Sequence, residues 1–543
     1  ALLATFGSDI PYSKGFFPPE NAFSESIVPA LVDEGFEWVL VDNIHFYRAC
    51  NNYPHTDASN LYAPNPADQL NPDPQDWLQL TGLWAPSKVS SGFGYRPHYV
   101  EYPGRDGKLR KIIVVPTARY MGNEDGRGGF GALNYDEVIS QLYNSPANND
   151  PQHPLLVVLH HDGDNYGGGT EAYYHNNFQN FINWLQANPT KVRATTVQDY
   201  LDMFPPEAED IIHVEDGSWS GADNGDPEFL KWNGDPDETG YSPDRNSWAV
   251  ITAAKNWVLT ANFSKPTDPE TQEALRWLLV GETSCYWYWD GTKDWDSKPT
   301  IAANQAILHA QNVEATDQWG PTIYHPQREP YNPGGDEWGI QQPTNFTIWT
   351  LVYDQSGIDQ VWLEIQNLGT NETTWEQQPM QESTWTAQTD PLPTACSSQF
   401  SAIVTGYNNT IVEYRVGAND TQGYTSYSEA KTVYIGAAES EEGEGTTPED
   451  ITVHQQKTFT STTPDYLHWG LDTDNDGNWE LPPEELWPPN TTAWYDGKAA
   501  HTLMTDPDGD GIYNTTLGPF REYEGVIIRY TIQYASGTWE GQD

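Results

Sequence analysis

The chain has 543 residues, of which 78 are Asp or Glu and 26 are Lys or Arg, so its formal net charge is −52. Nucleic-acid binding and attachment to anionic membranes both depend on Lys and Arg, so this charge argues against either partner. The 23 Trp and 13% aromatic content exclude a disordered acidic chain, and the length suits roughly three or four domains. No apolar run approaches the ~20 residues of a membrane-spanning helix, so membrane insertion is not expected.

Several features are those of a secreted protein. The chain begins at Ala1 without Met, as expected of a mature secreted product or of a fragment. Its three cysteines allow at most one disulfide. N-x-S/T sequons predict glycosylation at Asn262, Asn345, Asn371, Asn408, Asn419, Asn490 and Asn514. We therefore expect a secreted, extracellular glycoprotein.

Residues 1–204 alternate between strand and helix patterns. Ser24 can cap a helix that Gly35 ends, and the later helix covers 172–187. The β-branched runs predict strands at 36–41, 112–115, 155–159 and 192–195. Such runs separated by helices indicate parallel strands that are covered on both faces. The pattern therefore predicts a multidomain chain that begins with an α/β domain.

The rest of the chain changes character twice. The helical periodicity of residues 205–315 predicts helices at 247–259, 269–279 and 299–310. We expect them to form a helical subdomain that completes an active-site cleft. A linker at 316–342 precedes short alternating strands over 343–437, at 347–352, 360–366, 401–404, 411–416 and 430–435. These predict an immunoglobulin- or fibronectin-like β-sandwich. An acidic linker at 438–450 leads to a second β-sandwich over 451–543.

Two loops carry the residues best suited to chemistry. Glu20 lies among aromatic residues and prolines just before a helix, and His160, His161 and Asp162 follow a buried strand. Parallel α/β barrels place their chemistry at the carboxyl ends of the strands. Two carboxylates brought together there are the minimal equipment for glycoside hydrolysis. Two alternatives without glycoside hydrolysis remain. Glu20 can be a carboxylate that the helix dipole favours at a helix start, and His160, His161 and Asp162 can form a structural or metal cluster.

Several segments resemble glycoside hydrolase family 57, in the order in which that family carries them. Gly15–Phe23 is similar to its nucleophile segment G-(F/I/M)-W-(L/P)-P-E-(C/G), and Leu159–Asn165 to its L-D-G-E-N segment. Further matches to the family's later motifs are Val192–Leu201, Gly217–Trp219, Trp232–Gly234, Asn246–Trp248 and Ser284–Trp289. The resemblance covers roughly residues 10–315.

This resemblance implies a retaining enzyme that acts on α-glucans as an amylase, pullulanase or glucanotransferase. Glu20 would be the nucleophile and Asp162 the general acid/base. Sugar subsites would be lined by His160, His161, Asp42, Trp219, Trp232 and Trp287. Tryptophan faces suit sugar rings, although each of these indoles would equally suit core packing.

The sequence departs from the family at several points. Only 19 residues precede Glu20, whereas the family has further barrel strands before its nucleophile. The resemblance therefore implies that the α/β domain is an incomplete or distorted (β/α)7-type barrel. Phe17, Asp164 and Cys285 replace the family's Trp, Glu and Asp. We therefore expect a second chain or self-assembly to complete the barrel. The alternative is a catalytically impaired structural or carbohydrate-binding subunit of an extracellular assembly. A third reading is a metal-dependent deacetylase- or mannosidase-like barrel that uses His160, His161 and Asp162.

The last sandwich resembles starch-binding modules and has two acidic loops. In each loop, carboxylates alternate and a Gly follows the third, which is the spacing of a tight Ca²⁺-binding turn. The predicted ligands are Asp472, Asp474, Asp476 and Glu480 in the first loop and Asp506, Asp508 and Asp510 in the second. Acidic turns without an ion remain the alternative. Structural Ca²⁺ is the expected cofactor, with none needed for catalysis.

Overall fold

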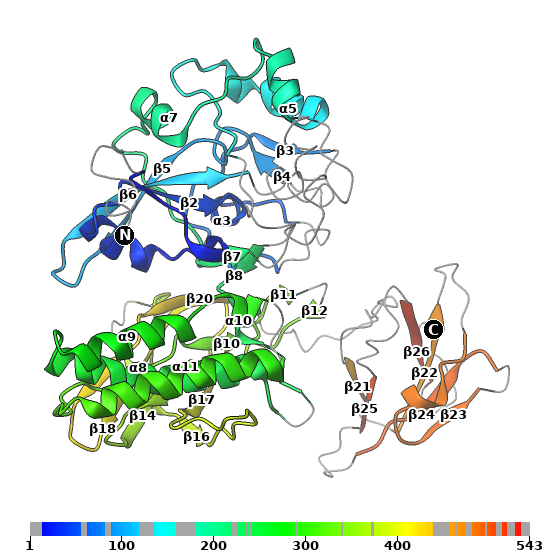
Figure 1. The fold of residues 1–543 in the computed structure, drawn as a ribbon. Helices are drawn as coiled ribbons and strands as arrows, with labels where there is room; N and C mark the ends of the chain where they lie inside the picture. The colour runs from blue at the N-terminus through cyan, green and yellow to red at the C-terminus, as the bar shows by residue number, and fades with distance from the viewer. Residues whose placement is uncertain are drawn as a thin grey trace. The chain divides into compact units, whose positions relative to one another are not determined.

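A computed structural model of the chain describes most of its residues and falls into two compact units, 1–439 and 440–543 (Figure 1). None of the helices in the described residues is long and apolar enough to cross a bilayer. The described residues are 13–55, 62–81, 88–118, 135–158, 181–219, 225–234, 236–237, 240–288, 292–337, 340–370, 374–437, 457–461, 464–472, 480–494, 497–506, 513–517 and 527–533.

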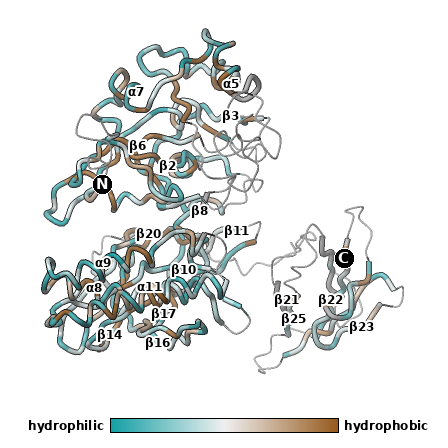
Figure 2. The backbone as a smooth tube through the Cα atoms, viewed as in Figure 1, coloured by the Kyte–Doolittle hydropathy of each residue, from teal (hydrophilic) through white to brown (hydrophobic). Residues whose placement is uncertain are grey.

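The first unit begins with a four-stranded sheet in the order β1-β2-β6-β5. Strands β1 (Gly15–Phe16), β2 (Trp38–Asp42) and β6 (Leu109–Thr117) run parallel, and β5 (His98–Pro103) is antiparallel to β6. Val39 and Val41 of β2 and Val114 and Val115 of β6 are fully buried, and Figure 2 shows hydrophobic residues along both strands. The predicted strands at 36–41 and 112–115 are confirmed, with slightly different bounds.

Short helices and hairpins surround this sheet. Ser24 caps the first helical turn as predicted, since its hydroxyl accepts the Ser26 N–H. The helix ends just before Gly35, whose φ of +87° is a conformation that suits glycine. The elements are η1 Pro19–Asn21, η2 Glu25–Ile27, α2 Val28–Asp33, α3 Ile44–Arg48, β3 Trp77–Gln79, β4 Lys88–Ser90, α5 Tyr135–Tyr143, η4 Pro146–Asn149, α7 Val197–Met203, β7 Gly217–Trp219, β8 Gly225–Pro227 and η5 Leu230–Asn233.

Two predicted strands are not formed as expected. In the stretch 155–158, Val158 forms a parallel bridge with Thr117. The Leu156 N–H bonds instead to the Tyr95 carbonyl, outside any ladder, so no longer strand pairing forms there. Residues 192–195 are irregular, and the Val192 N–H closes a turn onto Asn188 instead of pairing with a strand. The predicted helix at 172–187 is present over its described part, 181–187. Within the described residues the α/β sheet is open, so they do not form a closed barrel.

Three long helices form a layer after the α/β part: α8 (Pro243–Ser264), α9 (Pro269–Gly281) and α11 (Lys293–Asn312), with the short α10 (Cys285–Tyr288) between them. The three predicted helices are confirmed, and the two outer ones begin earlier than predicted. Ser242, Asp268 and Thr292 cap the three long helices by accepting N–H groups of their first turns. Small residues such as Ala254, Ala303 and Ala306 are buried between the helices, which lets their axes approach closely.

The helical layer packs on a two-sheet sandwich (Figure 1). One sheet has the order β10-β13-β17-β16, with β9 on β13, and the other has β15-β14-β18-β19, with β20 on β18. Their inward side chains form one apolar cluster, which confirms the alternating pattern predicted for 343–437. The strands are β9 Thr322–Ile323, β10 Gln327–Glu329, β13 Phe346–Tyr353, β14 Ile358–Asn367, β15 Glu376–Pro379, β16 Gln381–Ser383, β17 Ser398–Val404, β18 Thr410–Asp420, β19 Thr425–Tyr427 and β20 Lys431–Ile435.

The stretch 316–342, predicted as a linker, is part of the packed structure. It supplies β9 and β10 to the sandwich and a small hairpin, β11 (Asp336–Glu337) with β12 (Ile340–Gln341). Arg328 of this stretch pairs with Glu228 at 2.7 Å, and both side chains are buried. Asn332 of the same stretch accepts the amide of Asn65 at 3.1 Å. These contacts join the α/β part to the sandwich.

The second unit is built from strands, as predicted. One sheet has the order β23-β24-β22-β26, and β21 pairs separately with β25. Trp469 and Leu467 of β22 are fully buried in its apolar core. The elements are β21 Lys457–Ser461, β22 Tyr466–Asp472, η6 Glu484–Leu486, β23 Thr491–Ala493, β24 Ala500–Leu503, β25 Tyr513–Leu517 and β26 Ile527–Gln533.

Candidate active site

Glu20 lies just beyond the carboxyl end of β1, in the turn η1. Its φ of +56° and ψ of +24° are left-handed, which is uncommon for a residue with a side chain. Pro18 and Pro19 restrict the chain before it, and the Ala22 N–H closes the turn onto the Pro19 carbonyl at 3.0 Å. Backbone geometry of this kind is often found at functional sites, where the surrounding structure holds it in place.

Two distant segments hold the Glu20 carboxylate. The Trp219 indole N–H donates to Oε2, and the Ser284 hydroxyl donates to Oε1 at 3.1 Å. Trp219 belongs to the hairpin of β7 and β8, which reaches Glu20 because Phe23 and Gly217 exchange two backbone hydrogen bonds. With a donor on each oxygen, the carboxylate has a fixed orientation, as a positioned nucleophile requires.

A buried ion pair supports the segment that carries Trp219. Glu215 accepts the Arg48 Nε–H at 2.6 Å and the Arg48 Nη2–H at 3.0 Å, and its Oε2 lies 3.0 Å from His45 Nδ1. Burial opposes ionisation of Glu215, but the charge and hydrogen bonds of Arg48 and His45 outweigh it and lower its pKa to about 2. The bidentate pair thus fixes residue 215 against α3.

Position 217 accepts only glycine, because the His45 ring packs directly against its backbone. A Cβ built there would lie 2.2 Å from the His45 ring, a contact that side chains do not make. The other ring nitrogen of His45, Nε2, lies 3.0 Å from the Ser218 carbonyl oxygen. The hairpin strand β7 therefore sits directly on the imidazole, and Trp219 follows two residues later.

A second buried carboxyl lies behind this hairpin. The Trp232 indole donates to the Ser218 hydroxyl at 2.7 Å, and that hydroxyl donates to Asp226 at 3.1 Å. Burial raises the pKa of Asp226 to about 7, although hydrogen bonds from Lys231 and Ser218 act against the shift. Asp226 is thus a titratable group that is hydrogen-bonded to Ser218, the residue next to Trp219.

The predicted sugar-binding residues fall into two groups. All three indoles are buried, with Trp219 5%, Trp232 7% and Trp287 2% exposed. Trp219 donates to Glu20, whereas Trp232 and Trp287 lie in the core of the helical layer. Trp287 stacks on Trp248, with ring centroids 4.4 Å apart. Their place in the helical core favours the packing role that the sequence left open for both. Asp42 is buried at the end of β2, and its Oδ1 accepts the Ile44 N–H at 3.1 Å.

The other predicted catalytic loop lies outside the described residues. His160, His161 and Asp162 therefore stay predictions, as does the distance from Asp162 to Glu20. The described chain leads toward them at Val158, which pairs in parallel with Thr117 at the carboxyl end of β6. The carboxyl ends of β1, β2 and β6 lie at one edge of the sheet, because these strands are parallel.

The predicted calcium loops are described only at their ends. Leu471 bridges Glu480, and Thr505 bridges Asn514, so each acidic stretch leaves and rejoins a strand at neighbouring positions. Asp506 is described at the start of the second loop. Outside the described residues lie the side chain of Asp472 and the whole of Asp474, Asp476, Asp508 and Asp510. Of the predicted glycosylation sites, Asn345, Asn408 and Asn490 are exposed, Asn262, Asn419 and Asn514 are half-buried, and Asn371 lies outside the described residues.

Several residues of the site were not predicted as site residues. Ser284 stands in a segment that resembles a family motif, but its role as a donor to Glu20 had no local signal. Arg48 and Glu215 are 167 positions apart, and nothing in either neighbourhood indicates the pairing. Asp226 follows an acidic, Gly-rich stretch that is typical of a surface loop, yet it is buried.

Comparisons with known proteins agree with the motif resemblance. Residues 5–214 match the family model "Glycosyl hydrolase family 57", and residues 441–539 match "Alpha-glucan water dikinase 1 Ig-like N-terminal domain". An alpha-amylase of Niallia circulans is 24% identical over 578 aligned residues, which cover 79% of this chain and 44% of that protein. The chain thus spans less than half the length of this relative.

Among solved structures, the 4-alpha-glucanotransferase from Thermococcus litoralis aligns with 95% of this chain and 81% of that chain, at 12% identity and a TM-score of 0.34. The resemblance to glycosyl hydrolase family 57 is confirmed for the N-terminal region. The C-terminal region, where the sequence predicted a starch-binding-like sandwich, is similar to an Ig-like domain over residues 441–539.

Proposed function

We propose that this chain, with its family 57 region over residues 5–214, is an α-glucan-active hydrolase or glucanotransferase that retains anomeric configuration. The observation that carries the proposal is the Glu20 carboxylate, held by Trp219 and Ser284 beyond the end of a parallel strand. A fixed carboxylate with donors on both oxygens suits the nucleophile of a double displacement.

In the proposed mechanism Glu20 attacks the anomeric carbon while Asp162 gives its proton to the departing glycosidic oxygen. The resulting glycosyl ester is then attacked by water, or by the hydroxyl of an acceptor sugar, whose proton returns to Asp162. Retaining pairs stand ~5–5.5 Å apart, so the proposal requires Asp162 to reach that distance from Glu20. The bridge from Val158 to β6 supports this, because it brings the preceding chain to the same sheet edge.

The substrate class rests on the names of the matched relative and family model, which refer to alpha-amylase and alpha-glucan water dikinase. In the C-terminal unit, we propose Trp494 as an α-glucan contact. Its half-buried ring packs 4.9 Å from that of His468 and 4.6 Å from that of His501, measured between centroids. Trp494→Ala should weaken retention of the chain on amylose resin, whereas changing the core residue Trp469 would unfold the unit.

The main test compares the full chain with Glu20→Gln on amylose and maltooligosaccharides. Activity should fall at least about 1,000-fold in Glu20→Gln, because the amide is not a nucleophile. Glu34→Gln, an exposed change at the end of α2, is the matched control and should keep full activity. The first product should have the α configuration by NMR, and a trapped fluoroglycosyl adduct should map to Glu20.

Three outcomes would redirect the assignment. Inverted product, or an unaffected Glu20→Gln variant, would reject Glu20 as the nucleophile. A chain that binds amylose but cleaves nothing would support the catalytically impaired binding subunit. Activity that chelators abolish, on acetylated or mannose-containing substrates, would support a metal centre at His160, His161 and Asp162.

Secretion, glycosylation and a barrel-completing partner also belong to this proposal. The exposed sequons at Asn345, Asn408 and Asn490 suit glycan attachment. Intact-mass measurement of native material before and after glycosidase treatment tests it, and light scattering measures self-assembly. A mass equal to that of the bare chain would reject glycosylation.

A further inference from the structure

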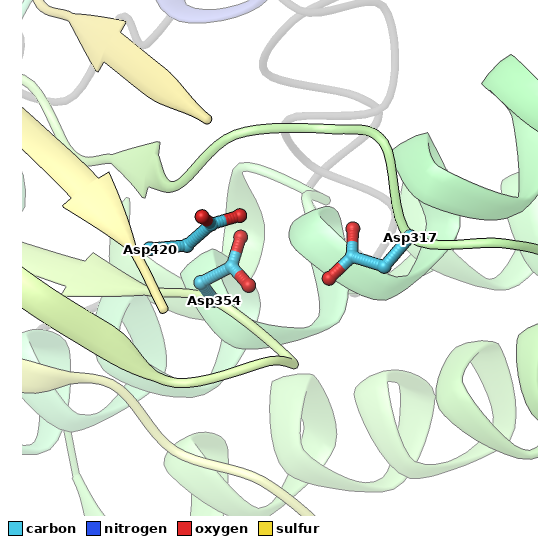
Figure 3. A group of neighbouring side chains, drawn as sticks. All are labelled: Asp317, Asp354 and Asp420. Carbon is cyan, nitrogen blue, oxygen red and sulfur yellow. The ribbon is translucent and has the colours of Figure 1, made fainter. Parts of the chain in front are cut away.

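Three aspartates meet where the helical layer joins the β-sandwich. Asp317 lies in the loop after α11, Asp354 directly follows β13, and Asp420 is the last residue of β18. One carboxylate oxygen of each lies within 4.8 Å of the others, and Figure 3 shows the three side chains directed toward a common space. These residues come from the helical part and from both sheets of the sandwich.

Each aspartate uses one oxygen to organise its own loop. Asp317 Oδ1 accepts the Trp319 N–H at 3.4 Å, and Asp354 Oδ1 accepts the Ser356 N–H at 2.8 Å. Asp420 Oδ1 accepts the N–H groups of Gln422 and Tyr424 at 2.9 and 2.8 Å. The Oδ2 atoms of Asp317 and Asp420 are buried and accept no hydrogen bond from any described residue. Asp420 is only 1% exposed, so this oxygen has no access to bulk solvent.

Within the described part of the chain, no Lys, Arg or His side chain forms an ion pair with these aspartates. The Asn256 amide donates to Asp354 Oδ2 at 3.2 Å, and its own Oδ1 is fixed by the Gln355 N–H at 3.0 Å. One neutral donor does not balance three carboxylates. Buried carboxylates without a counter-charge are costly, so the arrangement calls for a cation.

We propose that Asp317, Asp354 and Asp420 bind one Ca²⁺ ion that fastens the helical layer to the sandwich. Ca²⁺ accepts irregular sets of oxygen ligands, whereas Mg²⁺ demands near-octahedral geometry and keeps several waters. The Gly320 carbonyl oxygen, which accepts the same Asn256 amide at 3.4 Å, is available as a further oxygen ligand beside the cluster. This site is separate from the acidic loops of the C-terminal unit.

The experiment uses the full chain with Asp474→Asn and Asp508→Asn, which removes ligands of the two predicted C-terminal loops. Titration calorimetry with CaCl2 and metal analysis after dialysis should give one Ca²⁺ per chain in this background. Adding Asp420→Asn should weaken that binding at least about 100-fold. In the background chain 1 mM CaCl2 should raise the thermal midpoint by about 2 to 6 °C, and EDTA should reverse the rise.

Asp359→Asn is the matched control, because Asp359 is exposed on β14 and lies outside the cluster. It should bind Ca²⁺ as the background chain does. If Asp420→Asn does not fold, Asp317→Asn in the surface loop makes the same test with less effect on the core. A background chain that takes up no Ca²⁺ at 1 mM overturns the proposal. Binding that is unchanged in the folded cluster variant overturns it as well.

Discussion

The indole N–H of Trp219 donates a hydrogen bond to the carboxylate of Glu20, although the two residues are 199 positions apart. The contact exists because β7 lies beside the turn after β1, where Phe23 and Gly217 pair through their backbones at 2.8 and 3.0 Å. Orientation of the candidate nucleophile therefore depends on a hairpin that folds back from the far end of the α/β part.

Replacing Trp219 with Phe keeps a six-membered aromatic ring and removes the pyrrole ring with its N–H donor. We expect kcat on amylose to fall about 10- to 100-fold, because a freed carboxylate loses its attacking orientation. KM should change little, whereas the thermal midpoint should fall by a few degrees, because Trp219 is only 5% exposed and the smaller ring leaves a cavity. Trp295→Phe, on the solvent side of α11, is the control and should behave as the parent. A Trp219→Phe variant with unchanged kcat would contradict the positioning role.

Breaking the buried pair of Arg48 and Glu215 should destabilise the first unit strongly. Arg48→Met leaves the Glu215 carboxylate buried without its partner, so we expect the free energy of unfolding in urea to fall by about 3–5 kcal/mol. Adding Glu215→Gln should recover a large part of this loss, since the unbalanced charge is then gone.

The exposed pair of Arg276 and Glu273 on α9 provides the control for that comparison. Arg276→Met should cost less than about 1 kcal/mol, because solvent screens surface ion pairs. Equal losses of unfolding free energy from Arg48→Met and Arg276→Met would show that burial does not determine how much the Arg48–Glu215 pair stabilises the fold.

Asp226 should make the stability of the first unit depend on pH. Its pKa of about 7 in the fold lies above the usual 3.8, so between these values the folded chain holds a proton that the unfolded chain releases. Its contribution is therefore greatest near pH 4, declines as pH rises to 7, and is lost above that. Asp226→Asn removes this titration.

Between pH 5 and pH 8, the unfolding free energy of the parent should fall by about 2 to 4 kcal/mol relative to that of Asp226→Asn. Urea melts at each pH measure it. Asp199→Asn, in the first turn of α7, serves as the exposed control and should give a constant difference over this range. A constant difference for Asp226→Asn would mean that its carboxyl titrates normally.

The sandwich core offers a packing test with a matched residue type. Leu363 on β14 is 0% exposed, and Leu368 just after the same strand is 48% exposed. Leu363→Ala should lower the unfolding free energy by about 2 to 5 kcal/mol through lost burial and a cavity. Leu368→Ala should cost about 0.5 kcal/mol or less. Similar values for both would contradict the inward orientation of Leu363.

Local patterns in the sequence predicted much of the fold. The run ending at Asp42 is a strand, Ser24 caps a helix, and the alternation over 343–437 forms two packed sheets, because each signal lies within a few neighbouring residues. The same reasoning was wrong for 192–195, where a β-branched run has no ladder partner among the described residues. A strand needs a neighbour, and its own residues do not specify one.

The site divides in the same way. The sequence alone identified Glu20, through its prolines and a family motif, and it brought Trp219, Trp232 and Trp287 forward as equal candidates. Packing separated them, since Trp219 donates to Glu20 while the other two pack in the helical core. It also decided the pairing of Arg48 with Glu215 and the meeting of Asp317, Asp354 and Asp420. Charge balance and hydrogen bonding between distant segments arise only when the chain folds, so no local pattern encodes them.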